Sequence, residues 1–245
     1  MYDNKTHPSI LPCPKFYTRN TPFPKKKVYV FVDLETTGLN LFANGIIQIG
    51  AIATGENEGE FLGYFVKDAN PCKGTSSDGA FQRIEDSALK VNKFTHKRIE
   101  AAPYLADTLM QFENWLTDLA KFKIGEPERE IVIVCHGAKF DVPRIEFAFA
   151  QNNMEVPKVF RRVLCTVSLG YDVFGELLSL ENLSLKLDIT NGQSHDALAD
   201  AIVTMKVFHA LKRMKPNTTA WTPARQTLPN FLIQGPMDTK EFGAS

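Results

Sequence analysis

The sequence predicts an α/β fold built as one domain. Short runs of β-branched and aromatic residues alternate with segments whose apolar residues recur every three or four positions, which is the pattern of α/β proteins. The chain has 245 residues, 44% of them hydrophobic and 23% charged. This composition is typical of a globular protein and excludes disorder throughout the chain.

Five segments have the composition of strands. Residues 28–32 (VYVFV) form a run typical of a central strand buried on both faces. Residues 46–52 and 61–66 follow at short intervals, which predicts an antiparallel meander of three strands. Residues 131–135 (IVIVC) predict another buried strand, and residues 163–167 predict the fifth. We therefore expect a mixed five-stranded sheet covered by helices.

The helical segments lie between and after these strands. We expect helices over residues 82–98, 104–120 and 142–152, with Pro143 in the first turn of the last of these. Shorter helices lead through Leu187 to a final helix over residues 195–213, with Ser194 as its N-cap. The apolar stripe of helix 104–120 is Leu105, Leu109, Phe112, Leu116 and Leu119, and that of the final helix is Leu198, Ala201, Ile202, Met205 and Phe208.

Proline is concentrated at the two ends of the chain. Nine of the 14 prolines lie in residues 1–24 and 215–245, and both segments lack sustained apolar periodicity. We expect irregular ends there and a single domain over residues 25–214.

Charge and hydropathy narrow the function class and the compartment. The chain has 28 basic and 28 acidic residues, which argues against binding nucleic acid or membranes by bulk electrostatics but is compatible with a local basic groove. No stretch approaches the roughly 18 apolar residues of a membrane span, and the N-terminal segment lacks the apolar core of a signal peptide. We expect a cytoplasmic or nuclear protein that does not bind membranes. Its four cysteines are widely spaced, which favours buried free thiols over a zinc cluster.

Two acidic residues follow the first predicted strand. Asp33 and Glu35 are two positions apart, so in an extended chain their carboxylates lie on one face, roughly 7 Å apart. The C-terminal end of a central strand is where open α/β sheets bind ligands. The pair therefore indicates either a cation site or simply a polar exit from the strand.

Asp141 ends a second strand-to-turn unit, residues 134–141, and opens a predicted helix. By itself it has a structural interpretation as an N-cap. If strand 131–135 is the neighbour of strand 28–32, however, Asp141 emerges at the same sheet edge as Asp33 and Glu35.

The segment SHDALADA, residues 194–201, contributes a histidine and two further acids. Asp196 suits the N-terminus of the final helix, where a negative charge is favourable. Asp200 lies a turn deeper among apolar residues, where an unpaired carboxylate is costly and a metal ion would offset that cost. His195 is either an ordinary surface residue or part of the same site.

Four carboxylates and a histidine at one sheet end indicate metal-assisted phosphoryl transfer. Carboxylate oxygens are the ligands of hard divalent cations, and two such ions can stabilise the attacking and leaving oxygens of a phosphodiester. An imidazole, which titrates near neutral pH, can deprotonate the attacking water.

Three segments resemble, in order and spacing, the three motifs of the DEDDh exonuclease family: residues 33–39 (DLETTGL), 136–141 (HGAKFD) and 195–200 (HDALAD). Residues 46–51 (IIQIGA) also match the family, and the resemblance covers residues 28–211. Leu34 and residues 140–143 are most similar to three-prime repair exonucleases, and the pair Thr36 and Thr37 to the proofreading subunit of bacterial polymerase. Gly137 departs from the family, in which asparagine often follows the histidine.

The resemblance implies a ribonuclease H-like fold and removal of nucleotides from single-stranded 3′ ends, with two Mg²⁺ or Mn²⁺ ions. By position, it makes Asp33, Glu35, Asp141 and Asp200 the metal ligands and His195 the general base. It places Thr36, Leu39 and His136 at the 3′-terminal nucleotide. The expected products are 5′-mononucleotides, and DNA is favoured slightly over RNA.

A second hypothesis assigns the chain the same fold but no catalytic activity. In it the chain is a catalytically silent nucleic-acid-binding or scaffold module, for which the partly buried acidic residues have no evident use. A homodimer, or a larger protein partner bound through residues 215–245, is a further hypothesis about partners.

Overall fold

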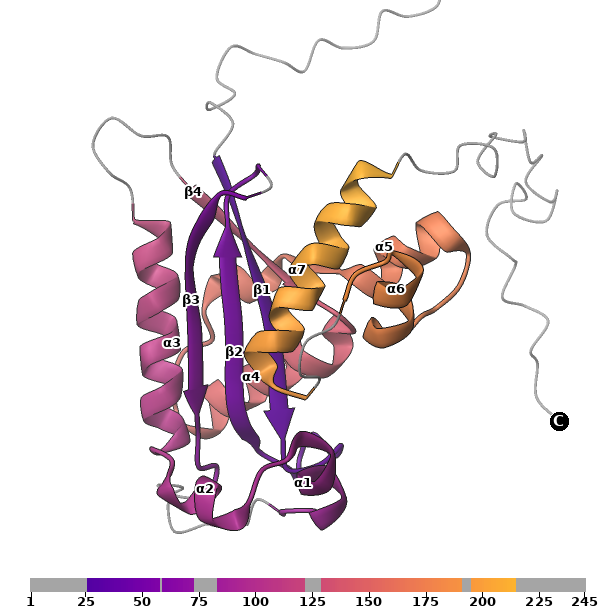
Figure 1. The fold of residues 1–245 in the computed structure, drawn as a ribbon. Helices are drawn as coiled ribbons and strands as arrows, with labels where there is room; N and C mark the ends of the chain where they lie inside the picture. The colour runs from indigo at the N-terminus through magenta and orange to yellow at the C-terminus, as the bar shows by residue number, and fades with distance from the viewer. Residues whose placement is uncertain (1–25, 58, 73–82, 122–128, 191–194, 215–245) are drawn as a thin grey trace, which may run out of the picture.

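The computed structural model describes residues 26–57, 59–72, 83–121, 129–190 and 195–214. A five-stranded sheet lies at the centre, in the order β3-β2-β1-β4-β5 (Figure 1). The antiparallel pairs β1–β2 and β2–β3 form the predicted meander, and β4 and β5 add parallel to β1. The strands are β1 (Lys26–Thr36), β2 (Ile46–Thr54), β3 (Phe61–Asp68), β4 (Arg129–Cys135) and β5 (Val163–Cys165).

Helices cover both faces of the sheet, as expected for the predicted α/β class (Figure 1). They are α1 (Asp86–Asn92), α2 (His96–Ala101), α3 (Leu105–Ala120), α4 (Ala138–Gln151), α5 (Thr166–Phe174), α6 (Leu180–Lys186) and α7 (Ala197–Arg213), with a 3₁₀ turn at Lys158–Arg161.

The alternation of side chains along β1 separates two hydrophobic layers. Val28, Val30 and Val32 pack with α3 and α4, whereas Tyr29 and Phe31 pack with α7. Both predicted helical stripes are confirmed: every residue of the α3 stripe is buried, and the α7 stripe packs against the second layer. A position on β1 with the parity of Phe31 therefore faces α7, which decides where the acids of this strand point.

Several predicted boundaries were wrong. Segment 82–98 holds two helices instead of one, because Lys93 adopts a left-handed conformation (φ 59°) and ends α1. Helix α4 begins at Ala138 instead of residue 142, so Asp141 lies inside its first turn and Gly137 is the N-cap. Helix α7 begins at Ala197 with Asp196 as its N-cap. Ser194, the predicted cap, lies outside the described residues.

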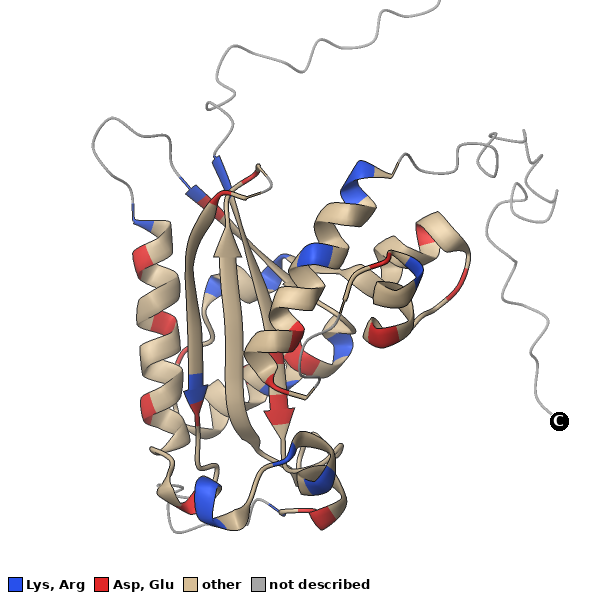
Figure 2. Ribbon diagram, in the orientation of Figure 1, with Lys and Arg blue, Asp and Glu red and all other residues tan. Residues whose placement is uncertain are grey.

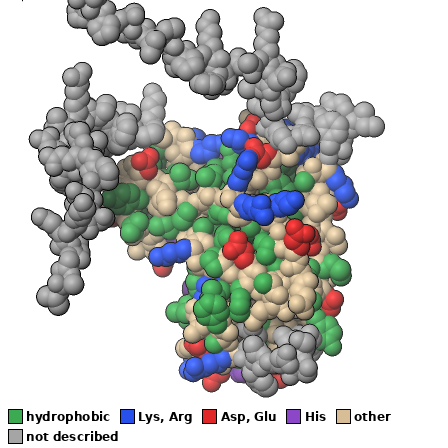
Figure 3. All heavy atoms as spheres, turned by 180° about the vertical axis from the view of Figure 1, so that it is seen from behind, with side chains coloured by type: hydrophobic (Ala, Val, Ile, Leu, Met, Phe, Trp, Pro, Cys, Tyr) green, Lys and Arg blue, Asp and Glu red, His purple; other side chains and the backbone are tan. Residues whose placement is uncertain are grey.

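The ends of the chain, residues 1–24 and 215–245, also lie outside the described residues, so the predicted domain limits remain predictions. Within the part that is described, no helix has the length and apolar character needed to span a membrane. The prediction of buried thiols holds for Cys135 but not for Cys72, which is exposed. Basic, acidic and hydrophobic side chains lie interspersed on the face shown in Figure 3, in keeping with a net charge of zero.

Candidate active site

The two acids of the first motif lie within β1, near its C-terminal end. Asp33 and Glu35 have the same parity as Tyr29 and Phe31, so both face α7. The prediction that they follow the strand was wrong, because β1 continues to Thr36. The extended backbone nevertheless places both carboxylates on one face, as the spacing indicated.

The neighbouring strand provides the surface on which α7 begins. Gly50 lies opposite Asp33 in the pairing of β1 with β2. A Cβ atom at Gly50 would come within 2.2 Å of the carbonyl carbon of Ala197 and 2.3 Å of the nitrogen of Leu198. The missing side chain therefore allows the first turn of α7 to rest directly on the sheet.

A glutamine fixes the same turn by hydrogen bonds. Gln48 lies opposite Glu35 and is buried. Its Oε1 accepts the backbone N–H of Ala197 at 2.9 Å, and its Nε2 donates to Oδ1 of Asp68 at 3.0 Å. Arg98 donates to both carboxylate oxygens of Asp68, at 2.6 and 2.8 Å. These bonds connect the start of α7 to β2, β3 and α2.

The third motif turns sharply into α7. Asp196 caps the helix by accepting the N–H of Ala199 at 3.1 Å, which confirms its predicted structural place at the N-terminus. His195 is exposed and has a positive φ of 65°. Its backbone N–H donates to Oδ2 of Asp200 at 3.0 Å, so the turn places His195 directly beside this acid.

Three carboxylates converge where these elements meet. Oxygen atoms of Asp33, Glu35 and Asp200 all lie within 4.8 Å of one another. Figure 2 shows the acidic end of β1 next to the acidic first turns of α7. Three negatively charged groups at this separation repel one another strongly, and a hard divalent cation would neutralise them.

The pKa values of the clustered carboxyl groups are raised, which shows that their ionised forms are disfavoured at these positions. Burial raises the pKa of Glu35 to about 8, helped by the negative charges of Asp200 and Asp196. Burial also raises the pKa of Asp33 well above its ordinary value, with Asp141 and Asp200 as the largest charged contributors. Desolvation likewise raises the pKa of Asp200. Carboxyl groups whose pKa values are raised by burial and by neighbouring negative charges fit a site whose charge is completed by a cation.

The fourth acid reaches the cluster from the other helical layer. Asp141 is 3% exposed, and burial raises its pKa to about 7, against the favourable charge of Arg144 and hydrogen bonds from backbone groups, Leu34 among them. Because β1 and β4 are parallel neighbours, the first turn of α4 lies at the same sheet edge as the end of β1. The expected convergence follows from this pairing, although Asp141 lies outside the group of three whose oxygens are within 4.8 Å.

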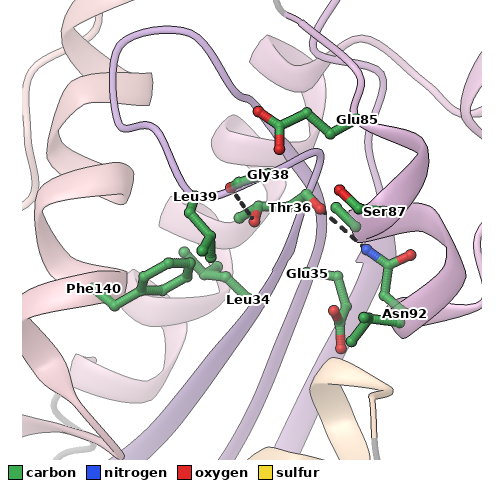
Figure 4. Close-up of a pocket in the computed structure, with 11 residues that line it drawn as sticks. Leu34, Glu35, Thr36, Gly38, Leu39, Glu85, Ser87, Asn92 and Phe140 are labelled. Carbon is green, nitrogen blue, oxygen red and sulfur yellow. Dashed lines mark hydrogen bonds between the residues drawn. The ribbon is translucent and has the colours of Figure 1, made fainter.

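A pocket of about 350 Å³ opens beside Glu35, and we call it the β1–α1 pocket (Figure 4). One side is an apolar wall of Leu34, Leu39 and Phe140, and the other is formed by α1, including Ser87 and Asn92. Asn92 donates to the carbonyl oxygen of Thr36 at 3.0 Å. Thr36 and Leu39 both line this pocket, next to an acid of the cluster, and their predicted contact with the 3′-terminal nucleotide remains a prediction.

His136, which was also expected at the 3′-terminal nucleotide, is not part of the β1–α1 pocket. It follows β4, and its Nδ1 is 2.8 Å from Oγ1 of Thr166 at the start of α5. Burial lowers its pKa to about 4. His136 is not among the residues that line the β1–α1 pocket, so its predicted contact with a substrate remains a prediction.

Sequence reasoning did not find the residues that hold the site in place. Gln48 and Gly50 carried a signal, since they interrupt the apolar run of residues 46–52. No sequence pattern indicated that α1 would form one side of the pocket or that Arg144 would be buried, because short amphipathic helices and single arginines are common in any sequence.

Comparison with known proteins agrees with the motifs. A family model described as an exonuclease of the RNase T type matches residues 30–208. The chain belongs to this exonuclease family. The predicted DEDDh membership and enzyme class are thereby confirmed at the level of the family.

The relatives of known identity include bacterial DNA polymerases. DNA polymerase III PolC-type of Bacillus subtilis is 27% identical over 193 residues, covering 78% of this chain and 12% of that protein. The corresponding polymerase of Lactococcus lactis is 26% identical over 200 residues, covering 80% of this chain and 11% of that protein. The chain thus spans about an eighth of the length of these relatives.

Solved structures share the fold, which confirms the ribonuclease H-like architecture. The nuclease domain of 3′hExo, a DEDDh family member bound to rAMP, has a TM-score of 0.62 at 13% identity, covering 80% of this chain and 98% of that one. Escherichia coli exonuclease I in complex with a dA16 oligonucleotide has a TM-score of 0.60 at 17% identity, covering 77% of this chain and 41% of that one.

Proposed function

We propose that this chain is a metal-dependent 3′→5′ exonuclease that removes nucleotides one at a time from single-stranded nucleic acid. The observation that carries the proposal is the convergence of acids from three distant segments. Asp33 and Glu35 come from β1, Asp141 from the first turn of α4 and Asp200 from α7. A purely structural role does not account for so many charges that destabilise one another.

The four carboxylates are the proposed ligands of two divalent cations, Mg²⁺ or Mn²⁺. Such cations would supply the positive charge that stabilises the attacking and leaving oxygens of a phosphodiester. The carboxylates contribute by position: β1 fixes two of them on one face, and the docking of α7 on Gly50 brings Asp200 beside them.

His195 is the proposed general base, accepting a proton from the attacking water at its imidazole. Support comes from the turn in which it lies. Its exposed side chain remains open to water, while its backbone N–H is bound to Asp200. The β1–α1 pocket, adjacent to Glu35, is the proposed site for the 3′-terminal nucleotide, with Thr36 and Leu39 among its contacts.

DNA is the favoured substrate. The polymerase relatives are DNA polymerases, and exonuclease I of similar fold is bound to a DNA oligonucleotide. The rAMP bound to 3′hExo favours RNA for a protein of the same fold. A direct comparison of the two sugars is therefore part of the test.

The test uses matched DNA and RNA oligonucleotides with a 5′ label, incubated with the protein and Mg²⁺. We expect a ladder of shortened strands, release of 5′-mononucleotides and complete inhibition by EDTA. The variant His195→Ala should lose most turnover and retain Mn²⁺ binding. His96→Ala is a matched control, because His96 is exposed on α2 and pairs with Asp86 instead of the acidic cluster.

Two results would contradict the proposal. One is the absence of any shortening of either substrate, with binding of 3′ ends that does not depend on metal, which would support the silent binding module. The other is a ladder that persists in EDTA.

A further inference from the structure

Arg144 is a buried arginine that lies behind the apolar wall of the β1–α1 pocket. It is in α4, three residues after Asp141, and only 7% of its surface is exposed. Burial of a guanidinium is unfavourable unless its donors are used. Its Nε is buried and has no hydrogen-bond partner among the described residues, so stability alone does not explain its presence.

The other donors of Arg144 bind the two outer members of the wall. Nη2 donates to the carbonyl oxygen of Leu39, and Nη1 donates to that of Phe140 at 3.0 Å. The guanidinium carbon also lies 3.5 Å from the centre of the Phe140 ring. One side chain thus holds together two wall residues that are a hundred residues apart in the sequence.

The loop that carries Leu39 is otherwise held mainly by its own residues and by the segment before α1. The N–H of Thr37 donates to the carbonyl oxygen of Gly45 at 2.9 Å, and that of Glu85 donates to the carbonyl oxygen of Thr37 at 2.9 Å. The ring of Phe42 packs edge-on against Phe147 of α4, with centroids 5.3 Å apart. Arg144 supplies the hydrogen bond that fixes the loop to α4 at the pocket itself.

We infer that Arg144 is a positioning residue that holds Leu39 against Phe140 and thereby makes cleavage depend on an intact base at the 3′-terminal nucleotide. The inference rests on the proposed function. Leu39 is 80% exposed, so its side chain is free to contact a ligand while its backbone is fixed from behind. An apolar wall of defined shape suits the flat face of a base, whereas the phosphate and sugar offer no such surface.

The experiment compares two single-stranded DNAs, one ending in thymidine and one ending in a tetrahydrofuran abasic nucleotide. Removal of the terminal nucleotide is followed at limiting substrate, which gives kcat/KM for each. We expect the wild type to prefer the strand with the base. In Arg144→Met this preference falls about tenfold, since hydrogen bonds from a charged group are lost, and kcat/KM falls much less on the abasic strand than on the strand with the base.

Four further variants and one binding measurement test this interpretation. Arg144→Lys keeps the positive charge but loses the paired hydrogen bonds of the guanidinium. Its preference for the strand with the base should lie between those of the wild type and Arg144→Met. Leu39→Ala should reduce the preference as well, and combining it with Arg144→Lys should add little. Lys206→Met removes an exposed charge on α7 and should change neither value. Mn²⁺ affinity should be equal in the wild type, Leu39→Ala and Arg144→Lys, since Arg144→Lys keeps the positive charge beside Asp141.

Equal losses on both strands would overturn the inference, because Arg144 would then act through the metal ligands or through folding. Equal cleavage of both strands by the wild type would overturn it as well. If Arg144→Met does not fold, the additivity of Arg144→Lys and Leu39→Ala decides the question. Absence of cleavage of either strand by the wild type would instead count against the proposed function.

Discussion

The backbone N–H of His195 donates a hydrogen bond to the carboxylate of Asp200, although His195 precedes α7 and Asp200 lies in its first turn. The positive φ of His195 reverses the chain so that this bond can form. Histidine tolerates the left-handed region better than most residues do. The turn therefore fixes the proposed base and a proposed metal ligand relative to each other.

We predict different outcomes for the two acids of this segment. Asp200→Asn should lower kcat by about 100-fold or more, because a carboxylate of the cluster becomes neutral. Asp196→Asn should have a mild effect, since asparagine also caps helices well. Rates of oligonucleotide shortening and thermal unfolding of both variants provide the measurement. Equal losses of activity would contradict the separate roles assigned to the two acids.

Gly50→Ala should detach the first turn of α7 from the sheet. The added Cβ would overlap backbone atoms of Ala197 and Leu198, which cannot rotate away. We expect a loss of about 1–3 kcal/mol in the free energy of unfolding, together with weaker Mn²⁺ binding. Gly170→Ala is the control, because its Cβ would meet the side chain of Leu183, with the two methyl groups at 3.0 and 3.3 Å, instead of backbone atoms. Similar losses in both variants would contradict the close-approach argument.

Stability of the metal-free protein should fall as pH rises from about 4.5 to about 8. Glu35 has an ordinary pKa of 4.5 and a folded pKa of about 8, so across this range the folded state retains a proton that the unfolded state releases. Asp141 adds to the fall up to about pH 7. Melting temperatures measured in EDTA provide the test.

Two controls separate this effect from the other titrations. Glu35→Gln removes the group and should make the fall with pH shallower. Adding Mn²⁺ should stabilise the wild type more at pH 8 than at pH 6, because the cation binds the deprotonated carboxylates. A melting temperature in EDTA that rises over this range and is unaffected by Glu35→Gln would contradict the prediction.

Gln48→Met should weaken the site without removing any of its ligands. Methionine has nearly the same shape but leaves the N–H of Ala197 without its acceptor, at a cost of about 1–3 kcal/mol. Weaker Mn²⁺ binding and a lower melting temperature are expected. Unchanged Mn²⁺ affinity would show that Gly50 alone suffices to place α7.

The sequence was informative where chemistry and local pattern coincide. Asp33 and Glu35 share a face because strands have a period of two. Two apolar runs predicted β1 and β4 as buried strands, but their parallel pairing was only a condition of the sequence argument and is supplied by the structure. Helix boundaries were less predictable: the position of Pro143 suggested a start near residue 142, but α4 begins a turn earlier at Ala138. The hydrogen bond from Arg144 to the carbonyl oxygen of Leu39 joins segments that are distant in the sequence, and no local pattern indicates such a contact.

The order in which the acids occur in the chain has a consequence for protein synthesis. All five strands precede residue 166, whereas Asp200 arrives with α7 and joins the site only when that helix docks on Gly50. Because domains acquire structure as the chain emerges from the ribosome, a nascent chain that ends before α7 contains the sheet but not the complete set of acids. Under the proposed function, the nascent chain therefore acquires its metal site only after α7 has been translated and has docked on the sheet.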